Sequence, residues 1–438
     1  MRIKLLTGAA LALVLASPAF ASSSTVTQND SDHEAIVDQT SSNASTSVIT
    51  QEDDDHFASV IQSDGASAGP QTDDNLSTIT QTGERNTTFV EQDNTGGDVN
   101  TSTVTQGATD ATAYVYQQGS GNTSAIEQVA GGNEIADVKQ SGDDNSSVIV
   151  QNGFGGSVTV DQGFFGGGSD AGIADIEQTG TDGVIEVVQS GTAQEVLINQ
   201  GGVENTVTTD QSGTDNFANV FQSGTRSDIS VIQIGDSAGN SAFLDQSGTD
   251  SDLFIVQDGS GNEAGGATAF LQSANNSTTL IDQIGDGNRV TGSQAGNLND
   301  IDLDQDGDSN TASLNQSGSN NILIVSQSIL GNEATVLQSG TNGEITLAQG
   351  GTDNVATLTQ SGNLNDLFVE QLGSDNVVLA TQTGNSGLID IYQNGQGAYA
   401  EVLQSGGAGN DALIIQNSDL AVAIITQNGA NNYASINQ

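Results

Sequence analysis

The sequence NVATLTQSGNLNDLFVEQLGSDN, at residues 354–376, contains one short pattern twice. In each copy, aliphatic residues lie four and two positions before a glutamine, as Ala356 and Leu358 do before Gln360. The residues that alternate with them in the first copy, Thr357 and Thr359, are polar. Alternation with a period of two predicts a strand with one buried face, and it places the glutamine on that face.

Each glutamine is followed by a predicted turn. Glycine stands two positions after the glutamine and asparagine five positions after it, as in Gly362, Asn365, Gly373 and Asn376. Glycine adopts positive φ freely, and asparagine tolerates left-handed backbone geometry better than most residues do. Each eleven-residue unit is therefore expected to form one strand and one turn.

Glutamine recurs at this interval along most of the chain. From Gln272 to Gln404 every interval is eleven residues, and the series extends from Gln28 to Gln438 when Gln71 is included. A fixed short period is typical of a stacked architecture in which each unit contacts its neighbours. The glutamines expected to form the stacking ladder are Gln283, Gln294, Gln305, Gln316, Gln327, Gln338, Gln349, Gln360, Gln371, Gln382, Gln393 and Gln404.

The residue four positions before the glutamine alternates in size. Between Ala312 and Leu367 it is alanine in every second unit and leucine or isoleucine in the others. A thin core between two facing strands fills best when a small residue meets a large one. The predicted fold is therefore all-β, a two-sided β-solenoid of stacked β-arches with about 18 rungs of about 22 residues each.

The buried glutamines also have a predicted task. A primary amide donates and accepts hydrogen bonds, so it can pair with identical amides above and below it. A buried amide left unpaired costs about 1–3 kcal/mol, which disfavours a slip in register. Asparagines such as Asn354 are expected to form a second ladder at the arch corners, interrupted at Gly343 and Gly387.

The repeat is less regular in its first part. We expect one repeat domain over residues 22–438, irregular over 22–177 and regular over 178–438. The long intervals 162–178 and 257–272 contain several glycines, and we interpret them as widened turns that leave the strands in register. No domain boundary is expected within the repeat.

The first 21 residues differ from the rest. A basic start is followed by an apolar stretch that ends at Ala16, and Ala19 and Ala21 form a small-x-small cleavage site around Phe20. This pattern predicts a secretory signal peptide over residues 1–21. No later segment is apolar enough to span a membrane. The mature chain is therefore predicted to be secreted and not inserted into a membrane.

Composition limits the possible functions. The formal net charge is −49, which argues against nucleic acid as a partner because phosphates are bound by lysine and arginine. No cysteine is present, so disulfides and thiolate metal sites are unavailable. His33 and His56 are the only histidines, and a Ser-His-Asp triad or a histidine zinc site is hard to assemble from them. We expect neither an enzyme nor a cofactor.

Two acidic stretches are similar to cation-binding patterns. Asp304, Asp306, Asp308 and Asn310 alternate as the first ligands of a calcium loop do, but the terminal glutamate is missing. We interpret them as turn residues, and weak Ca²⁺ binding along acidic faces stays open. Residues 53–56, with the sequence Asp-Asp-Asp-His, are interpreted as a solvated loop rather than a metal site.

The segment QGGTDNVATLTQ, residues 349–360, resembles the curlin repeat, Q-x-G-x-x-N-x-A-x-V-x-Q. The resemblance covers about residues 28–438 and implies a secreted bacterial amyloid subunit that forms adhesive fibres of the biofilm matrix (curli). It also implies two partners, an outer-membrane secretion pore and a minor nucleating subunit. The chain is most similar to the major subunit, because its last basic residue is Arg289 and a nucleator would end in a basic repeat. It has about 18 rungs where curlins typically have about five, and no Gly/Asn-rich secretion-targeting segment is evident.

The repeat continues to Gln438 without a capping segment, and we expect end-to-end addition of copies into filaments. The protein's principal partner would then be itself. The alternative is a monomeric, acidic β-solenoid that acts as an adhesin or a cation-binding matrix protein.

Overall fold

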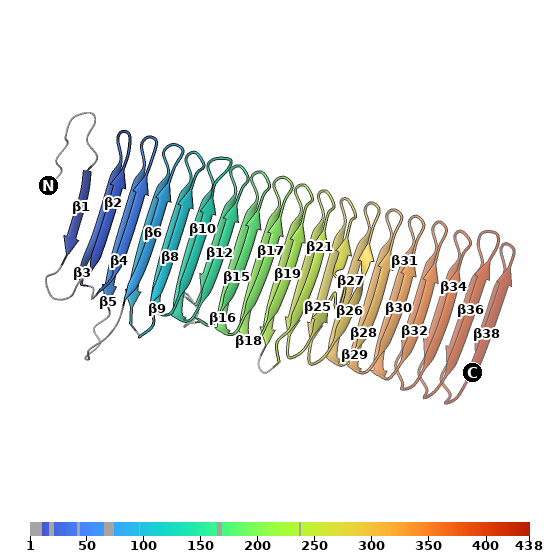
Figure 1. Ribbon diagram of the computed structural model, residues 1–438. Helices are drawn as coiled ribbons and strands as arrows, with labels where there is room; N and C mark the ends of the chain where they lie inside the picture. Colours follow the sequence, from blue (N-terminus) through green and yellow to red (C-terminus); the bar gives the residue numbers. More distant parts are fainter. Residues whose placement is uncertain are drawn as a thin grey trace. The chain divides into compact units, whose positions relative to one another are not determined.

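A computed structural model describes residues 11–16, 22–41, 44–64, 74–95, 97–163, 169–235 and 238–438. These residues form strands joined by short turns (Figure 1). They divide into two compact units, Met1–Asn216 and Phe217–Gln438. No helix among the described residues has the length and apolarity needed to cross a membrane.

In the first unit, strands alternate between two parallel sheets. One sheet contains β1 (Leu11–Ala16), β3 (Glu34–Ser41), β5 (Phe57–Asp64), β7 (Thr87–Asn94), β9 (Thr112–Ser120), β11 (Ile135–Asp143), β13 (Ser157–Gln162), β14 (Ser169–Asp170), β16 (Val184–Thr192) and β18 (Thr206–Thr214). The other contains β2 (Ser23–Gln28), β4 (Thr46–Gln51), β6 (Asn75–Gln81), β8 (Asn100–Gln106), β10 (Thr123–Gln128), β12 (Ser146–Gln151), β15 (Ile173–Gln178) and β17 (Glu195–Gln200).

The second unit is built in the same way. One sheet contains β20 (Asp228–Gly235), β22 (Asp252–Asp258), β25 (Thr278–Ile284), β27 (Asp300–Asp308), β29 (Ile322–Leu330), β31 (Glu344–Thr352), β33 (Asp366–Gln371), β35 (Leu388–Gln393), β37 (Asp411–Gln416) and β39 (Tyr433–Asn437). The other contains β19 (Phe217–Gln222), β21 (Ser241–Gln246), β23 (Glu263–Ala264), β24 (Phe270–Gln272), β26 (Arg289–Gln294), β28 (Thr311–Gln316), β30 (Glu333–Gln338), β32 (Val355–Gln360), β34 (Val377–Gln382), β36 (Tyr399–Ser405) and β38 (Val422–Asn428).

Strand pairing confirms the predicted 22-residue rung. β31 pairs in parallel with β33 and aligns Gln349 with Gln371, while β32 pairs with β34 and aligns Gln360 with Gln382. Consecutive strands therefore belong to different sheets, except where β13 and β14, or β23 and β24, divide one position in a sheet, and strands hydrogen-bond to the strand one rung away. The predicted all-β solenoid of about 18 two-strand rungs is confirmed.

The core lies between the two sheets of each unit. In β32, Ala356, Leu358 and Gln360 are buried, whereas the alternating threonines are only partly so. The size alternation is explained by the pairing, because alanine stacks on alanine in one sheet and leucine on isoleucine in the other. Ala334 aligns with Ala356, and Ile345 aligns with Leu367.

The turns differ from the prediction in one respect. The residue with left-handed backbone geometry is the one before the asparagine, such as Leu364 (φ 56°) or Asp375 (φ 57°). Asn365 is buried, because its side chain hydrogen-bonds inside the arch. Gly373 does not have positive φ, but a Cβ there would collide with the carbonyl oxygen of Gly395 in the next rung. Close stacking of turns therefore requires glycine at residue 373, whereas Gly362 has the predicted positive φ, at 104°.

Two irregular intervals also differ from the prediction. Gln71 lies outside the described residues. Gln62 pairs directly with Gln92, 30 residues further along, so the spacing of the ladder here is longer than the predicted 22 residues. The interval 257–272 is not a widened turn. Its extra residues separate β23 from β24, and Gly265 and Gly266, both at positive φ, begin the excursion. The strand resumes at Phe270, which is fully buried.

The signal peptide over residues 1–21 remains a prediction. β1 aligns with β3 in parallel from Leu11 to Ala16. The proposed cleavage residues Ala19 and Ala21 lie outside the described residues. The first compact unit ends at Asn216. A single repeat domain over residues 22–438, irregular over 22–177 and regular over 178–438, stays a prediction.

Candidate functional site: the stacked amide ladders

The twelve glutamines expected to stack all lie inside the second unit. Each is at most 1 % exposed, and each Nε2 donates to the Oε1 of the glutamine one rung further along the chain. In one sheet the distance is 2.8 Å from Gln283 to Gln305 and 2.9 Å from Gln349 to Gln371. In the other it is 2.9 Å from Gln338 to Gln360. Each sheet therefore contributes one continuous glutamine ladder to the unit.

Backbone carbonyls provide further acceptors for the same amides. Gln349 Nε2 lies 3.1 Å from the carbonyl oxygen of Glu333 and 3.1 Å from that of Asn354. Both amide hydrogens therefore have acceptors in the dry interior, which avoids the cost of an unpaired buried polar group. The amides are fixed in one orientation, and all Nε2 atoms point toward the C-terminal neighbour. The ladder is consequently polar, with donors toward one end and acceptors toward the other.

The first unit contains the same ladders across its irregular spacing. Gln51 Nε2 donates to Gln81 Oε1 at 2.8 Å although 30 residues separate them, and Gln162 donates to Gln189 at 2.9 Å across 27 residues. Insertions between strands therefore leave the amide stacking intact.

Asparagines form ladders at both corners of the arch. The Oδ1 of Asn354 accepts the backbone N–H of Asn376 at 3.1 Å, and its Nδ2 donates to the carbonyl oxygen of Gly373 at 3.0 Å. At the opposite corner, Gly343 still donates its N–H to Asn321 Oδ1 at 2.9 Å. Glycine therefore removes an acceptor from the ladder but keeps the donor.

Near the N-terminus, two stacked histidines occupy the same corner of the arch as Asn321 and Gly343. The rings of His33 and His56 lie 5.2 Å apart and are nearly parallel at 3°. His56 Nδ1 accepts the backbone N–H of Asn86 at 3.2 Å, and its Nε2–H donates to the carbonyl oxygen of Glu52 at 2.6 Å. Burial, followed by the neighbouring His33, lowers the pKa of His56, while the Glu52 carbonyl, Asp53 and Asp55 act in the opposite direction. Residues 53–56 are interpreted from the sequence as a solvated loop. The three aspartates are exposed and agree with this, but His56 is buried.

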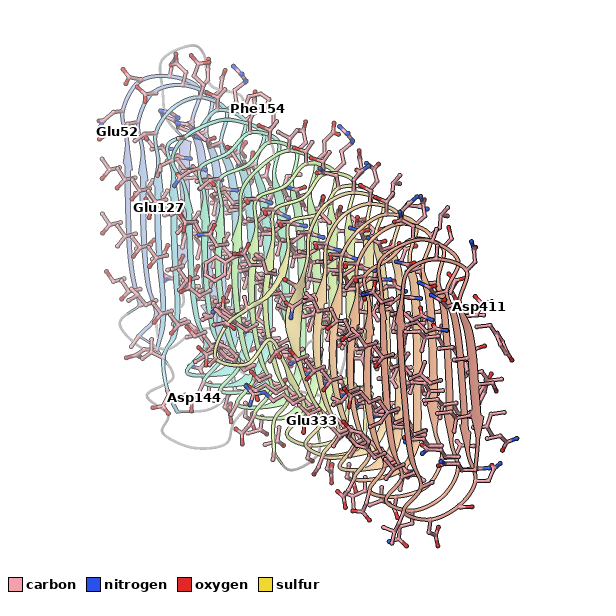
Figure 2. The ribbon with its side chains drawn as sticks, turned by 90° about the vertical axis from the view of Figure 1, so that its right-hand side faces the viewer. Glu52, Glu127, Asp144, Phe154, Glu333 and Asp411 are labelled. Carbon is pink, nitrogen blue, oxygen red and sulfur yellow. The ribbon has the colours of Figure 1, made fainter. Side chains whose placement is uncertain are left out.

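Carboxylates are concentrated on the outer faces. Figure 2 shows Glu127 in the first unit and Glu333 in the second directed away from the strands. β27 is the most acidic strand, because every outward position from Asp300 to Asp308 is an exposed aspartate. Asp304, Asp306 and Asp308 therefore lie along an extended strand, so their interpretation as turn residues is wrong.

The outward aspartates repel one another. Partial burial, followed by the charge of Asp304 in the next strand, raises the pKa of Asp282. Partial burial, followed by Asp306 and Asp302, raises the pKa of Asp304. Across the described ranges, no three His, Cys, Asp or Glu side chains are arranged to hold a metal ion. Weak Ca²⁺ binding to these faces stays a prediction.

Comparison with known proteins gives one family. The model of the curlin associated repeat matches residues 202–235, 274–307, 299–328, 340–373 and 351–384. No curated protein matches the chain. Five repeat matches, a 22-residue rung and a buried glutamine at the end of nearly every strand agree with one another, and the chain is therefore a curlin-repeat protein.

Proposed function

We propose that this protein is a secreted structural subunit that assembles end to end into extracellular, curli-like amyloid fibres of a biofilm matrix. The observation that carries the proposal is the pair of polar glutamine ladders. Every rung presents the same donors to the next rung and the same acceptors to the previous one. The curlin repeat and the solenoid fold both point to a structural rather than a catalytic role.

The physical argument is that a rung from a second copy can replace a rung of the same chain. Such a contact joins two different surfaces of one protein, so it does not close and produces a filament. Each added rung would extend both parallel sheets and both amide ladders, and it would bury the aliphatic residues of the previous rung. Burying one isoleucine side chain contributes about 1.5–3 kcal/mol.

The remaining parts of the proposal concern export and surface function. After removal of residues 1–21, the chain would cross the outer membrane through a secretion pore and meet a minor nucleating subunit at the cell surface. The fibres would then mediate adhesion and cell aggregation. These steps rest on the curlin repeat, whose proteins are extracellular surface components.

A matched pair of variants tests end-to-end assembly. Ile436 in β39 alternates with outward Ser435 and is partly buried in its rung. Ile436→Lys places a charge between stacked rungs, whereas Ser435→Lys places the same charge on the outer face. We expect the unaltered protein and Ser435→Lys to form filaments by electron microscopy and Ile436→Lys to stay monomeric. Filaments of equal length from Ile436→Lys would contradict assembly through this face.

The second candidate function is a monomeric, acidic matrix protein that binds cations, and the row of aspartates on β27 favours it. Electron microscopy separates the two. Purified residues 22–438 that stay monomeric over days at room temperature would support the matrix protein and refute the fibre subunit.

A further inference from the structure

The outer face of one sheet in the first unit is made almost entirely of threonine. β2, β4, β6 and β8 are neighbours in that sheet (Figure 1), and each strand has three outward positions ahead of its glutamine. Three of these twelve residues are Ser23, Val48 and Leu76, and the other nine are threonine. The nine are Thr25, Thr27, Thr46, Thr50, Thr78, Thr80, Thr101, Thr103 and Thr105. We call the twelve side chains the threonine face.

The pairing register aligns the threonines in rows that run from rung to rung. Thr27 aligns with Thr50, which aligns with Thr80, and Thr80 aligns with Thr105. Every rung from β2 to β8 therefore contributes a threonine to this row. The glutamines that follow these threonines are 23, 30 and 25 residues apart, so the rows stay aligned although the turns differ in length.

Rows of this kind have fixed spacings. Neighbouring strands are about 4.8 Å apart, and alternate residues of a parallel strand are about 6.6 Å apart. Threonine is branched at Cβ, which restricts χ1 and leaves its methyl and hydroxyl groups few orientations. The threonine face is therefore a regular two-dimensional array of methyl and hydroxyl groups.

The threonine face carries no charged side chain, although the formal charge of the chain is −49. The row of threonines ends at β10, where Glu127 aligns with Thr105, and Figure 2 shows Glu127 directed away from the strands. Glu52 follows β4 in the turn, beyond the end of the face. The other sheet of the same rungs carries acids at outward positions, such as Asp38 and Glu91. The threonine face therefore suits an uncharged partner.

Its size and composition argue against a protein partner. At the spacings above, three positions on four strands cover about 400 Å², and each side of a standard protein interface buries about 800 Å². The face also lacks tryptophan, tyrosine and arginine, the residues that supply most of the energy of protein interfaces. A crystalline surface needs no such anchor, because many weak contacts at regular spacing hold it.

We propose that the threonine face binds ice. Its two spacings approach the oxygen repeats on the prism plane of hexagonal ice. A hydroxyl offers one donor and two acceptors, so it can replace a water molecule of the lattice. The methyl groups between the hydroxyls order the water around them, and this water can join the crystal. The rigid array lowers the entropy lost on binding.

Ice binding goes beyond the proposed function and does not depend on it. The threonines point outward from strands whose glutamines point inward, so the stacking of rungs leaves the face open. A monomer and a filament would present the same threonine face. Failure of the fibre proposal therefore leaves ice binding standing, and the reverse also holds.

The test measures how much of the protein, as residues 22–438, enters a slowly growing ice crystal, with sedimentation in parallel to record its assembly state. Thr78→Lys with Thr103→Lys places two charges at the centre of the face. Thr87→Lys with Thr112→Lys is the matched control, because it places the same charges on the other sheet of the same two rungs. We expect the unaltered protein and the control to enter the ice, and the face variant to enter about tenfold less.

A milder variant keeps the test valid if the lysines prevent folding, which thermal unfolding detects. Thr78→Ser with Thr103→Ser keeps both hydroxyls and removes two outward methyl groups, and we expect its uptake into ice to fall severalfold. Exclusion of the unaltered protein from ice, or equal uptake of the two lysine variants, would overturn the proposal. Exclusion from ice together with retention on microcrystalline cellulose would assign the face to a polysaccharide instead.

Discussion

At the scale of the residue, glutamine joins neighbouring rungs because its amide can pair with copies of itself. Gln349 receives a hydrogen bond from Gln327 at 2.8 Å and donates one to Gln371 at 2.9 Å. A leucine would fill the same space but would take the donor from the Gln371 oxygen. Gln327 would keep only the carbonyl oxygens of Thr311 and Asn332 as acceptors. The burial of these glutamines could be predicted from their phase with the aliphatic residues. The common direction of the ladder could not, because it depends on backbone carbonyls that only the fold brings near.

Removing one amide tests its contribution. Gln349→Ala leaves the Gln371 oxygen without its donor and creates a cavity, so we expect a loss of about 2–4 kcal/mol in the free energy of local opening. Hydrogen exchange of β29, β31 and β33 measures it. Exposed Gln396→Ala is the control and should change stability by less than about 0.5 kcal/mol. A similar, small effect of both substitutions would contradict a stabilising role for the ladder.

The histidine stack gives a prediction about pH. His56 must stay neutral to accept the Asn86 N–H, and its pKa in the fold is lowered from 6.5. The unfolded chain therefore takes up the proton first, and stability is lost as pH falls below about 6.5. We expect residues 57–64 to lose protection from proteolysis between pH 7 and pH 5. Asn86 occupies the same corner position in the next rung, so His33→Asn with His56→Asn should abolish this loss; an unchanged pH dependence would exclude the histidines as its cause.

At the scale of the element, the inner positions of a strand are restricted to one pattern of residue types, whereas the outer positions accept many. The inner positions of β27 are Ile301, Leu303 and Gln305, while all its outer positions are aspartate. Strand positions could be predicted because the inner pattern recurs in every unit. The left-handed residue before the asparagine could not, since aspartate, leucine, serine and asparagine all occupy it. The break between β23 and β24 could not be predicted from the sequence either, because the glycines there are as numerous as those of a wide turn.

Neutralising one outward aspartate should stabilise its rung. Asp304 lies beside Asp282 in the paired strand, and its pKa is raised, so the ionised form is disfavoured in the fold. Asp304→Asn is expected to stabilise by about 0.2–1 kcal/mol at pH 7, and the gain should disappear below about pH 4 as the carboxyl is protonated. Thermal unfolding at both pH values measures it. Glu333→Gln, which faces Thr311 and Val355, is the control, and an equal gain there would argue against repulsion.

At the scale of the whole molecule, the repeat makes stability a sum over rungs and their contacts. The solenoid class, the number of rungs and the 22-residue period could all be predicted from glutamine spacing and the Ala/Leu alternation. The division into two compact units could not, because no change in composition marks Asn216. The stacking of Phe89 on Tyr114 could not be predicted either, since these residues are 25 positions apart and meet only when rungs stack.

Net charge predicts how conditions affect assembly. Copies that carry a charge of about −49 repel one another, and salt screens this repulsion over about 8 Å at physiological ionic strength. Filament formation followed by light scattering should therefore accelerate on raising NaCl from 10 to 150 mM on the order of severalfold, and further with millimolar Ca²⁺. Rates that do not depend on salt, pH or Ca²⁺ would contradict an electrostatic barrier.

The most direct test is a cryo-electron microscopy map of filaments grown from residues 22–438, at a resolution that separates strands. End-to-end stacking predicts parallel strands about 4.8 Å apart along the filament axis, with both glutamine ladders continuing without a gap from one molecule to the next. A map in which molecules associate side by side, or in which the ladders stop at each molecular boundary, would contradict it.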